Sequence, residues 1–286
     1  MKEPDMQSAI ARPPLERDAP AGPYAPPRRV TCLDDCVFYH TMDIPGYGTV
    51  EGPWDLRAGV REYLGGVDLR GKRVLELGTA SGYLCFHMEQ QGAEVVGYDV
   101  TATQAEEMNV VPYARTQRQG ALDYVRRMIA KLNNSWWLCH RAFGSAARVV
   151  YGNIYAVPAA IGPVDVATFG SILLHLRDPF QALASALPLV RETVIITEPL
   201  CEAEHPTWND PEPAPSLAFQ PNYRTAFPPA TWWSFSPEVL RRFLGVLGFE
   251  ETAVTYHAQL FKNQRFPMFT VVGRRTAPRT PAAWHQ

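Results

Sequence analysis

The feature that most constrains the fold is a strand, a glycine turn, a helix and a second strand, all within residues 73–99. Residues 73–82 read Arg-Val-Leu-Glu-Leu-Gly-Thr-Ala-Ser-Gly, and residues 93–99 read Ala-Glu-Val-Val-Gly-Tyr-Asp. A glycine directly after a buried strand lets the backbone pass close to a ligand, and the following helix presents free N–H groups to it. The acid that ends the second strand, Asp99, is placed to accept hydrogen bonds from a ribose diol. The pattern therefore predicts an open α/β sheet with an adenosine-type site.

The same alternation of strands and helices continues through most of the chain. Short runs of β-branched and apolar residues predict strands, and apolar residues spaced three and four apart predict helices. Strands separated by helices in this way form right-handed βαβ units. We therefore expect a seven-stranded, mostly parallel α/β sheet with helices on both faces and an antiparallel strand at the edge. The predicted strands are 74–77, 94–98, 148–151, 164–169, 193–197, 250–258 and 266–272, and the predicted helices are 57–64, 83–91, 121–132, 181–187 and 236–247.

Changes in composition divide the chain into parts. The first stretch holds seven prolines and few large apolar side chains, so it buries too little surface to offset chain entropy. A stretch rich in proline and aromatic residues follows the fifth predicted strand and favours a cover over a substrate. We expect a disordered tail at 1–29, a lead-in or cap at 30–66, and a main domain at 67–276 with a helical insertion at 103–146 and a substrate lid at 199–235, followed by a flexible tail at 277–286.

Composition narrows the classes of partner. The formal net charge of −2 and the pI near 6.4 argue against a nucleic-acid binder that relies on bulk positive charge. Five cysteines, of which only Cys32 and Cys36 lie close together, disfavour a disulfide framework and a zinc site, so we expect no metal. No window approaches the roughly 18 apolar residues of a membrane helix, and no secretory signal is present. We expect a cytoplasmic protein with a small-molecule substrate and no membrane partner, and its oligomeric state is left open.

Two cofactor classes share a strand, a glycine turn and a helix, and the residues of the turn separate them. Dinucleotide-binding folds need G-x-G-x-x-G, whose third glycine lets the helix pack closely on the strand. Here Ala80 and Tyr83 occupy the second and third glycine positions, and a tyrosine cannot replace that glycine. An acid two residues before the first glycine, Glu76, suits a ligand with a positively charged amino group. The turn therefore disfavours NAD and FAD.

At these residues the chain resembles the class I, Rossmann-like S-adenosylmethionine-dependent methyltransferases, whose first motif is an acid, any residue, and glycines at alternate positions. Residues 76–82 match that motif except that Ala80 replaces the middle glycine. The likeness runs from about residue 71 to residue 274, and residues 162–179 look like the family's fourth-strand motif, whose loop faces the transferred methyl group. The resemblance implies S-adenosyl-L-methionine as the cofactor. The residues implied to bind it are Glu76, Gly78, Thr79, Ala80, Ser81, Gly82, Asp99, Asn153, Ile154 and Gly170.

A narrower likeness, to the tRNA wobble-uridine carboxymethyltransferase group, rests on residues 52–57, Gly-Pro-Trp-Asp-Leu-Arg, and on residues 180–183, Phe-Gln-Ala-Leu. In that group, extra basic and aromatic side chains bind a carboxylated form of the cofactor. Those side chains have no residue-by-residue match here, so a carboxylated cofactor is not implied. Trp54 and Arg57 are candidates to close over the cofactor, with Arg57 pairing to its carboxylate; the alternative is that they anchor the lead-in to the core.

Methyl transfer needs an acceptor aligned with the methyl group, and it needs a general base mainly when the acceptor is a hydroxyl. His175 is the catalytic candidate because it should lie just past the fourth strand, at the sheet edge where ligands bind. The alternative is that His175 packs against the cofactor turn without proton transfer. The candidates for substrate binding are His40, Tyr223, Trp232 and Trp233, each with a packing or surface role as the alternative.

The sequence thus predicts an enzyme that transfers a methyl group from S-adenosylmethionine to a hydroxyl or amine of a small molecule. Two alternatives stay open. A tRNA-modifying methyl- or carboxymethyltransferase of the same fold is suggested by a basic run in the insertion, from Arg115 to Arg148. A catalytically silent cofactor-binding protein is suggested by Ala80 and by the lack of a clear base.

Overall fold

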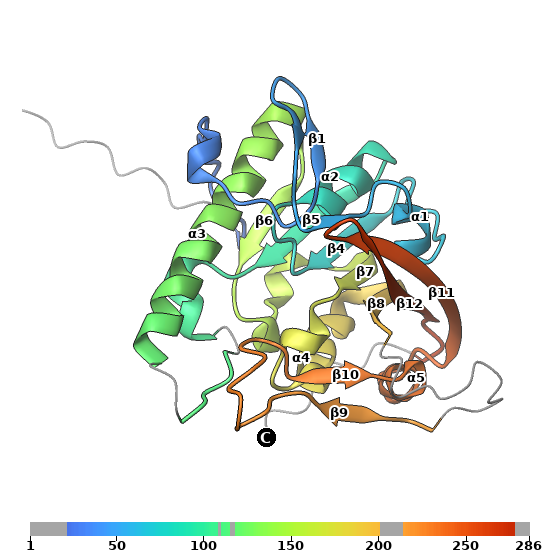
Figure 1. Cartoon of the computed structure of the whole chain (residues 1–286). Helices are drawn as coiled ribbons and strands as arrows, with labels where there is room; N and C mark the ends of the chain where they lie inside the picture. Colours follow the sequence, from blue (N-terminus) through green and yellow to red (C-terminus); the bar gives the residue numbers. More distant parts are fainter. Residues whose placement is uncertain (1–21, 108–109, 115–117, 201–213, 278–286) are drawn as a thin grey trace, which may run out of the picture.

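A large twisted sheet forms the centre of the fold (Figure 1). The structure is a computed structural model that describes residues 22–107, 110–114, 118–200 and 214–277. Within these residues the central sheet has eight strands in the order β3-β11-β12-β8-β7-β4-β5-β6. Their bounds, in that order, are Trp54–Asp55, Glu251–Phe261, Gln264–Arg274, Val190–Pro199, Val164–Gly170, Arg73–Leu77, Glu94–Asp99 and Arg148–Tyr151.

The predicted Rossmann-like α/β fold is confirmed. Strands β8, β7, β4, β5 and β6 pair in parallel, and β12 and β11 add antiparallel strands at one edge. The described sheet has one strand more than predicted, because the short β3 of the lead-in pairs with β11 through Asp55 and Leu260. Two residues carry too little periodicity to be recognised as a strand from the sequence.

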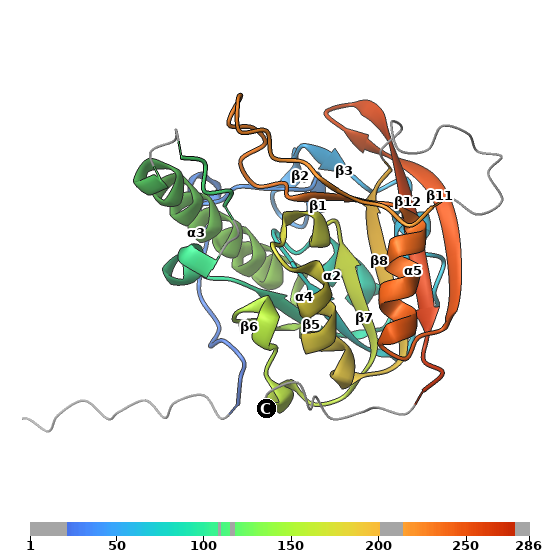
Figure 2. The ribbon, with the colours of Figure 1, turned by 90° about the horizontal axis from the view of Figure 1, so that it is seen from below.

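Helices cover both faces of the sheet (Figure 2). α1 (Val60–Tyr63), α2 (Tyr83–Gln90) and α3 (Arg118–Phe143) contribute to the apolar cluster on one face. α4 (Pro179–Ala186) and α5 (Pro237–Val246) contribute to the cluster on the other face. Short 3-10 helices lie at Leu33–Asp35, Ala102–Glu107, Ile154–Ala156, Ala159–Ile161, Leu173–His175 and Leu187–Leu189.

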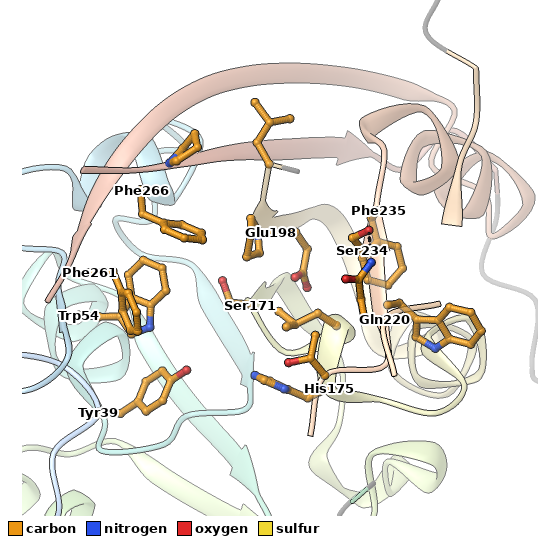
Figure 3. Close-up of a pocket in the computed structure, with 16 residues that line it drawn as sticks. Tyr39, Trp54, Ser171, His175, Glu198, Gln220, Ser234, Phe235, Phe261 and Phe266 are labelled. Carbon is orange, nitrogen blue, oxygen red and sulfur yellow. Dashed lines mark hydrogen bonds between the residues drawn. The ribbon is translucent and has the colours of Figure 1, made fainter. Parts of the chain in front are cut away.

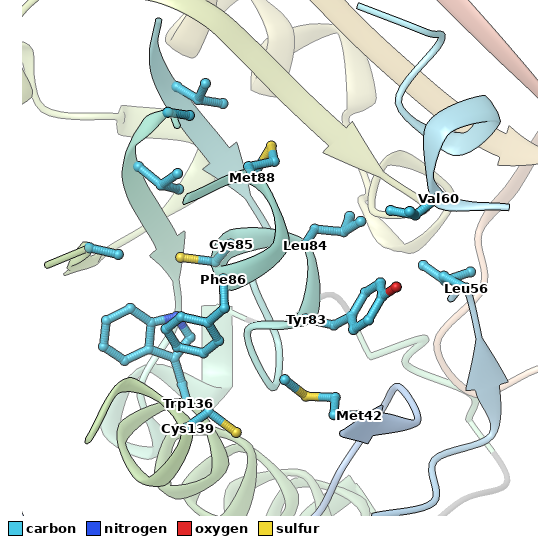
Figure 4. Packing of buried hydrophobic residues seen from close by; sticks show 14 of the residues in the cluster. Met42, Leu56, Val60, Tyr83, Leu84, Cys85, Phe86, Met88, Trp136 and Cys139 are labelled. Carbon is cyan, nitrogen blue, oxygen red and sulfur yellow. The ribbon is translucent and has the colours of Figure 1, made fainter. Parts of the chain in front are cut away.

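The predicted insertion is mainly the long helix α3, which packs on α2 (Figure 4). Phe86 of α2 lies against Trp136 of α3, with ring centroids 5.4 Å apart. Trp136 and Cys139 are buried, and Met42 of the lead-in reaches the same cluster. The predicted helix, 121–132, was shorter than α3 at both ends. The C-terminal end was missed because the second half of α3 is apolar on more than one face and lacks the clean period of a surface helix.

Two antiparallel hairpins were not predicted. In the lead-in, β1 (Met42–Ile44) pairs with β2 (Gly48–Val50). Between the fifth parallel strand and α5, β9 (Leu217–Phe219) pairs with β10 (Trp233–Phe235), with Phe219 opposite Trp233. The β9–β10 hairpin lies within the predicted lid, of which residues 201–213 are outside the described residues.

The N-terminal segment contacts the sheet before the predicted lead-in begins. Most of the predicted tail, 1–29, lies outside the described residues, as does 278–286. The Ala25 N–H donates to the Val149 carbonyl of β6 at 2.8 Å, and the Arg148 guanidinium lies 4.0 Å from the ring centre of Tyr24. Among the described residues, no helix combines the length and the apolar character needed to cross a membrane.

Candidate active site

The glycine turn joins β4 to α2 at the carboxyl edge of the sheet. Gly78 and Gly82 both have positive φ, +83° and +89°, and Gly82 is the residue that precedes the first turn of α2. A Cβ on Gly78 would lie 3.0 Å from the side chain of Ile172, so glycine also allows close packing there. Ala80 is held at a φ of +48°, a conformation that residues other than glycine rarely adopt. The turn therefore has the backbone shape of a glycine loop in spite of its alanine.

Asp99 fixes this turn from the end of β5. One carboxylate oxygen, Oδ2, accepts the Ala80 N–H at 2.7 Å, and Oδ1 accepts the Val100 N–H at 2.8 Å. A carboxylate has about four acceptor positions, so two remain unused by these backbone groups. Burial raises the pKa of Asp99, and the two backbone N–H groups oppose that shift.

A small cavity, which we call the nucleoside cavity, lies beside Asp99. Its volume is about 80 Å³. Ligand pockets usually measure about 300–1,000 Å³, so side chains around it must move to admit a nucleoside. Four predicted cofactor residues, Gly78, Asp99, Asn153 and Ile154, meet in this cavity. Its lining residues are Gly78, Tyr98, Asp99, Val100, Gly152, Asn153, Ile154, Ile172, His175 and Leu176.

Three other predicted cofactor residues have side chains that form hydrogen bonds within the protein. Thr79 donates its hydroxyl to Glu76 Oε2 at 2.7 Å, and Ser81 accepts the Tyr39 N–H at 3.2 Å. Burial raises the pKa of Glu76 to about 8, with the Thr79 hydrogen bond opposing it. Glu76, Thr79 and Ser81 line neither the nucleoside cavity nor its larger neighbour. The Glu76–Thr79 pair therefore supports the turn from within, and Ser81 ties the turn to the backbone of the lead-in.

A second cavity, the acceptor cavity, has a volume of about 630 Å³ (Figure 3). One wall is aromatic, because Trp54, Phe261 and Phe266 pack with ring centroids 4.7–6.0 Å apart. The opposite side carries polar groups, including Gln220 and Ser234 of the β9–β10 segment. Its lining residues are Tyr39, Trp54, Ser171, Leu174, His175, Glu198, Pro199, Leu200, Gln220, Thr231, Trp233, Ser234, Phe235, Phe261, Phe266 and Pro267.

His175 lines both cavities and so lies at the boundary between them. Its Nδ1 is 2.7 Å from the Ala230 carbonyl of the β9–β10 segment. A carbonyl oxygen only accepts, so Nδ1 carries the hydrogen and Nε2 keeps a lone pair. Burial lowers the pKa of His175, with the Ala230 hydrogen bond opposing it, which favours the neutral ring.

Sequence reasoning missed Glu198, near the end of β8. Its side chain is 0% exposed, and it also lines the acceptor cavity. Oε1 accepts the Leu173 N–H at 3.0 Å, whereas Oε2 has no hydrogen-bond partner. Burial raises the pKa of Glu198 well above its usual range, and the nearby backbone N–H groups of Leu173 and Leu174 oppose that shift, although only the Leu173 N–H has hydrogen-bond geometry to the carboxyl group. An acid at the carboxyl end of a predicted parallel strand was the signal available in the sequence.

The remaining cofactor candidates lie apart from the nucleoside cavity. Trp54 belongs to the acceptor cavity. Arg57 is bound by Asp43 at 2.9 Å and by Asp55 at 2.7 Å, and lines neither of the two cavities. Gly170 ends β7, where a Cβ would lie 3.0 Å from the Tyr63 hydroxyl.

The four substrate candidates are scattered. Trp233 lines the acceptor cavity, and the buried Trp232 donates its backbone N–H to the Leu174 carbonyl at 2.8 Å. Tyr223 is 70% exposed and lines neither cavity. His40 packs against the ring of Tyr83, and burial lowers its pKa to about 4. The described residues contain no group of three or more His, Cys, Asp or Glu side chains that could hold a metal ion.

Comparisons with known proteins agree with this architecture. Residues 55–253 match the methyltransferase domain family. The N-terminal domain of EvdMO1, solved with SAH bound, is 16% identical, with a TM-score of 0.51 over 85% of this chain and 92% of that chain. Magnesium protoporphyrin IX methyltransferase (ChlM) from Synechocystis PCC 6803, also solved with bound SAH, is 14% identical, with a TM-score of 0.47 over 77% of this chain and 82% of that chain. Among curated proteins, none matches the sequence.

The EvdMO1 likeness, at that identity, supports the fold alone. The family match is a stronger finding because it covers more than half of the chain, from β3 through the start of β11. The chain therefore belongs to the methyltransferase domain family, as one of the class I S-adenosylmethionine-dependent methyltransferases that its glycine turn predicts.

Proposed function

We propose that this protein transfers a methyl group from S-adenosylmethionine to a hydroxyl or amine of a small molecule bound in the acceptor cavity. The observation that carries the proposal is the meeting of two cavities at His175, one beside Asp99 and one with aromatic and polar walls. Transfer requires the acceptor atom about 3–3.5 Å from the methyl carbon and in line with the bond that breaks. Adjoining cavities support that arrangement.

The residues around the nucleoside cavity suit the adenosine half of the cofactor. Asp99 keeps acceptor capacity for the ribose hydroxyls, and Ile154, which lines the same cavity, would offer an apolar side chain to the adenine. The bound cofactor would supply an electrophilic methyl group on a sulfonium. The protein's own part is to bind, to align the acceptor and to keep water out with the aromatic wall.

The lining of the acceptor cavity disfavours an acceptor with a negative charge. None of the described lining residues is a lysine or an arginine, so a phosphate or carboxylate group would find no cation there. The aromatic wall of Trp54, Phe261 and Phe266 suits a flat apolar body. The polar side, with Gln220 and Ser234, suits a hydroxyl or amine.

Cofactor binding is tested by calorimetric titration of SAH into the wild-type protein and Asp99→Ala. We expect the variant to bind SAH about 10- to 100-fold more weakly, since hydrogen bonds to a charged group contribute about 1.5–3 kcal/mol. Asp123→Ala, which removes an exposed carboxylate of α3, should leave the affinity unchanged. Equal affinities for wild type and Asp99→Ala would refute the site assignment.

Methyl transfer is tested with S-adenosylmethionine labelled in its methyl group and incubated with cell extract. A labelled small molecule is the expected product. Label in tRNA would favour the RNA-modifying alternative, and no labelled product of any size would favour the silent binding protein. Tight tRNA binding that falls steeply with salt would also support the RNA alternative.

A further inference from the structure

The acceptor cavity contains one buried acid with an unused oxygen. Glu198 has no exposed surface, and its Oε2 is the atom without a hydrogen-bond partner. Its other oxygen is fixed by the Leu173 N–H at 3.0 Å. Figure 3 shows the carboxyl group pointing into the space between the aromatic wall and His175. A buried polar atom without a partner is rare and costs stability, so it calls for an explanation.

Among the described residues, no cation pairs with the Glu198 carboxyl group. The titratable groups that face it are Tyr39, Tyr63 and His175. Burial is the main cause that raises the pKa of Tyr39 and of Tyr63, and the charge of Glu198 adds to both shifts. Neither tyrosine makes a hydrogen bond to Oε2, which has no hydrogen-bond partner in the structure. A structural ion pair is therefore not its role in the described part of the chain.

We propose that Glu198 is the general base of the methyl transfer and that the acceptor is a neutral compound carrying a hydroxyl group on a flat apolar ring system. This inference rests on the proposed function. In the step, the hydroxyl oxygen forms a bond to the methyl carbon, the bond from that carbon to sulfur breaks, and the proton of the hydroxyl moves to Glu198 Oε2. The cofactor leaves as the neutral thioether, so charge and atoms balance.

The choice of Glu198 over His175 follows from the opposite effects of burial. Burial makes the Glu198 carboxylate a stronger base than usual and the His175 imidazole a weaker one. The His175 ring is also tethered to Ala230, whereas Oε2 is unengaged. Because Oε2 is fully covered, an acceptor reaches it through rotation of neighbouring side chains, a common change on ligand binding.

The hydrogen bond from the Leu173 N–H determines how a Gln side chain at position 198 would be oriented in the Glu198→Gln variant. The Leu173 N–H needs an acceptor, so the amide oxygen of Gln would take that place and its NH₂ group would point into the cavity. The variant therefore presents a donor where the proposal needs a proton acceptor. Glu198→Asp keeps the base but shortens the side chain. Glu89→Gln is the matched control, since Glu89 also accepts a backbone N–H, from Ala146 at 2.7 Å, but lines neither cavity.

The first measurement is calorimetric binding of two probes to the SAH-loaded protein. 2-Naphthol carries a hydroxyl on a flat ring system, and 2-methoxynaphthalene is its methyl ether without the O–H donor. We expect wild type and Glu89→Gln to bind 2-naphthol about 10- to 100-fold more tightly than 2-methoxynaphthalene. Glu198→Gln should bind the two probes with similar affinity. Equal binding of the two probes by wild type, no binding of either, or an unchanged preference in Glu198→Gln would overturn the proposal.

The second measurement is the rate of methyl transfer from labelled S-adenosylmethionine to 2-naphthol across pH. A positioned general base contributes about 10²- to 10⁴-fold, so Glu198→Gln should be slower than wild type by at least about 100-fold, with partial recovery in Glu198→Asp. The wild-type rate should rise with pH as Glu198 ionises, and Glu198→Gln should lack that rise. A variant as fast as wild type, or no transfer by wild type, would contradict the assignment.

The two proposals fail in different ways. If SAH does not bind, the proposed function is wrong. If SAH binds and extract yields a labelled small molecule, but the probes show no dependence on Glu198, then only the assignment of the base and its acceptor class is wrong.

Discussion

Ala80 is the residue of the cofactor turn whose backbone conformation is unfavourable for its side chain. Its φ of +48° costs about 1–2 kcal/mol for a residue with a side chain. The hydrogen bond from its N–H to Asp99, at 2.7 Å, offsets part of that cost. The turn therefore keeps the geometry of the glycine motif although one glycine is missing.

We expect Ala80→Gly to stabilise the protein by up to about 1 kcal/mol, because relief of the positive φ exceeds the entropy lost by glycine. The measurement is the free energy of unfolding from urea denaturation. Ala184→Gly in α4, a helical position, is the control and should destabilise by about 1 kcal/mol. If both substitutions destabilise equally, Ala80 is not strained.

The hydroxyl group of Ser236 forms hydrogen bonds both to α5 and to the segment that leads into β9. Ser236 precedes α5 and is fully buried. Its Oγ accepts the Val239 N–H at 3.3 Å and the Ser216 N–H at 2.8 Å. The same side chain thus caps the start of the helix and anchors the segment that leads into β9.

We expect Ser236→Ala to lower the free energy of unfolding by about 1–2 kcal/mol, because it removes the helix cap and leaves two N–H groups without their acceptor. Urea denaturation measures the change. The matched control, Ser216→Ala, keeps the backbone N–H that Ser236 binds and should change stability by less than about 0.5 kcal/mol. A loss equal to that of the control would show that the cap contributes nothing.

Across the whole molecule, buried titratable groups link stability to pH. Glu76 has a pKa of about 8 in the fold against an ordinary value of 4.5, so between these values the folded state holds more protons than the unfolded state. Its contribution to stability is therefore lost as pH rises from 4.5 to 8. Burial raises the pKa of Asp99 and Glu198 in the same direction. His40 acts in the opposite sense, because its pKa of about 4 lies below the ordinary 6.5.

We expect Glu76→Gln to remove one part of this dependence without losing the Thr79 hydrogen bond, which the amide oxygen can accept. The stability of the variant relative to wild type should increase with pH, by up to about 1.4 kcal/mol per pH unit within the window. The measurement is urea denaturation at several pH values without cofactor. Glu251→Gln, at an exposed position of β11, should show no such trend; a similar trend there would exclude Glu76 as the cause.

How far the sequence predicts the fold depends on the length and period of each element. The parallel strands β4 to β8 and the capped helix α5 were recognisable, because buried strands and helix caps leave short, local patterns. The hairpin β9–β10 was not, because its strands are three residues long and the contact between Phe219 and Trp233 joins residues distant in the sequence. The site divides in the same way: Gly78 and Asp99 belong to a local motif, whereas Phe261 and Trp54 meet only through the pairing of β11 with β3.

By itself the sequence determined the sheet, the cofactor turn and the class of ligand, since these depend on residues within about one βαβ unit of each other. Only the tertiary structure decided which side chains face the acceptor. It paired Thr79 with Glu76 and Ser81 with the lead-in, left Arg57 in surface ion pairs, and brought Glu198, His175 and the aromatic wall together. The physical reason is burial: whether a carboxyl group keeps an unpaired oxygen, and how its pKa shifts, depends on neighbours that the chain brings together from distant positions.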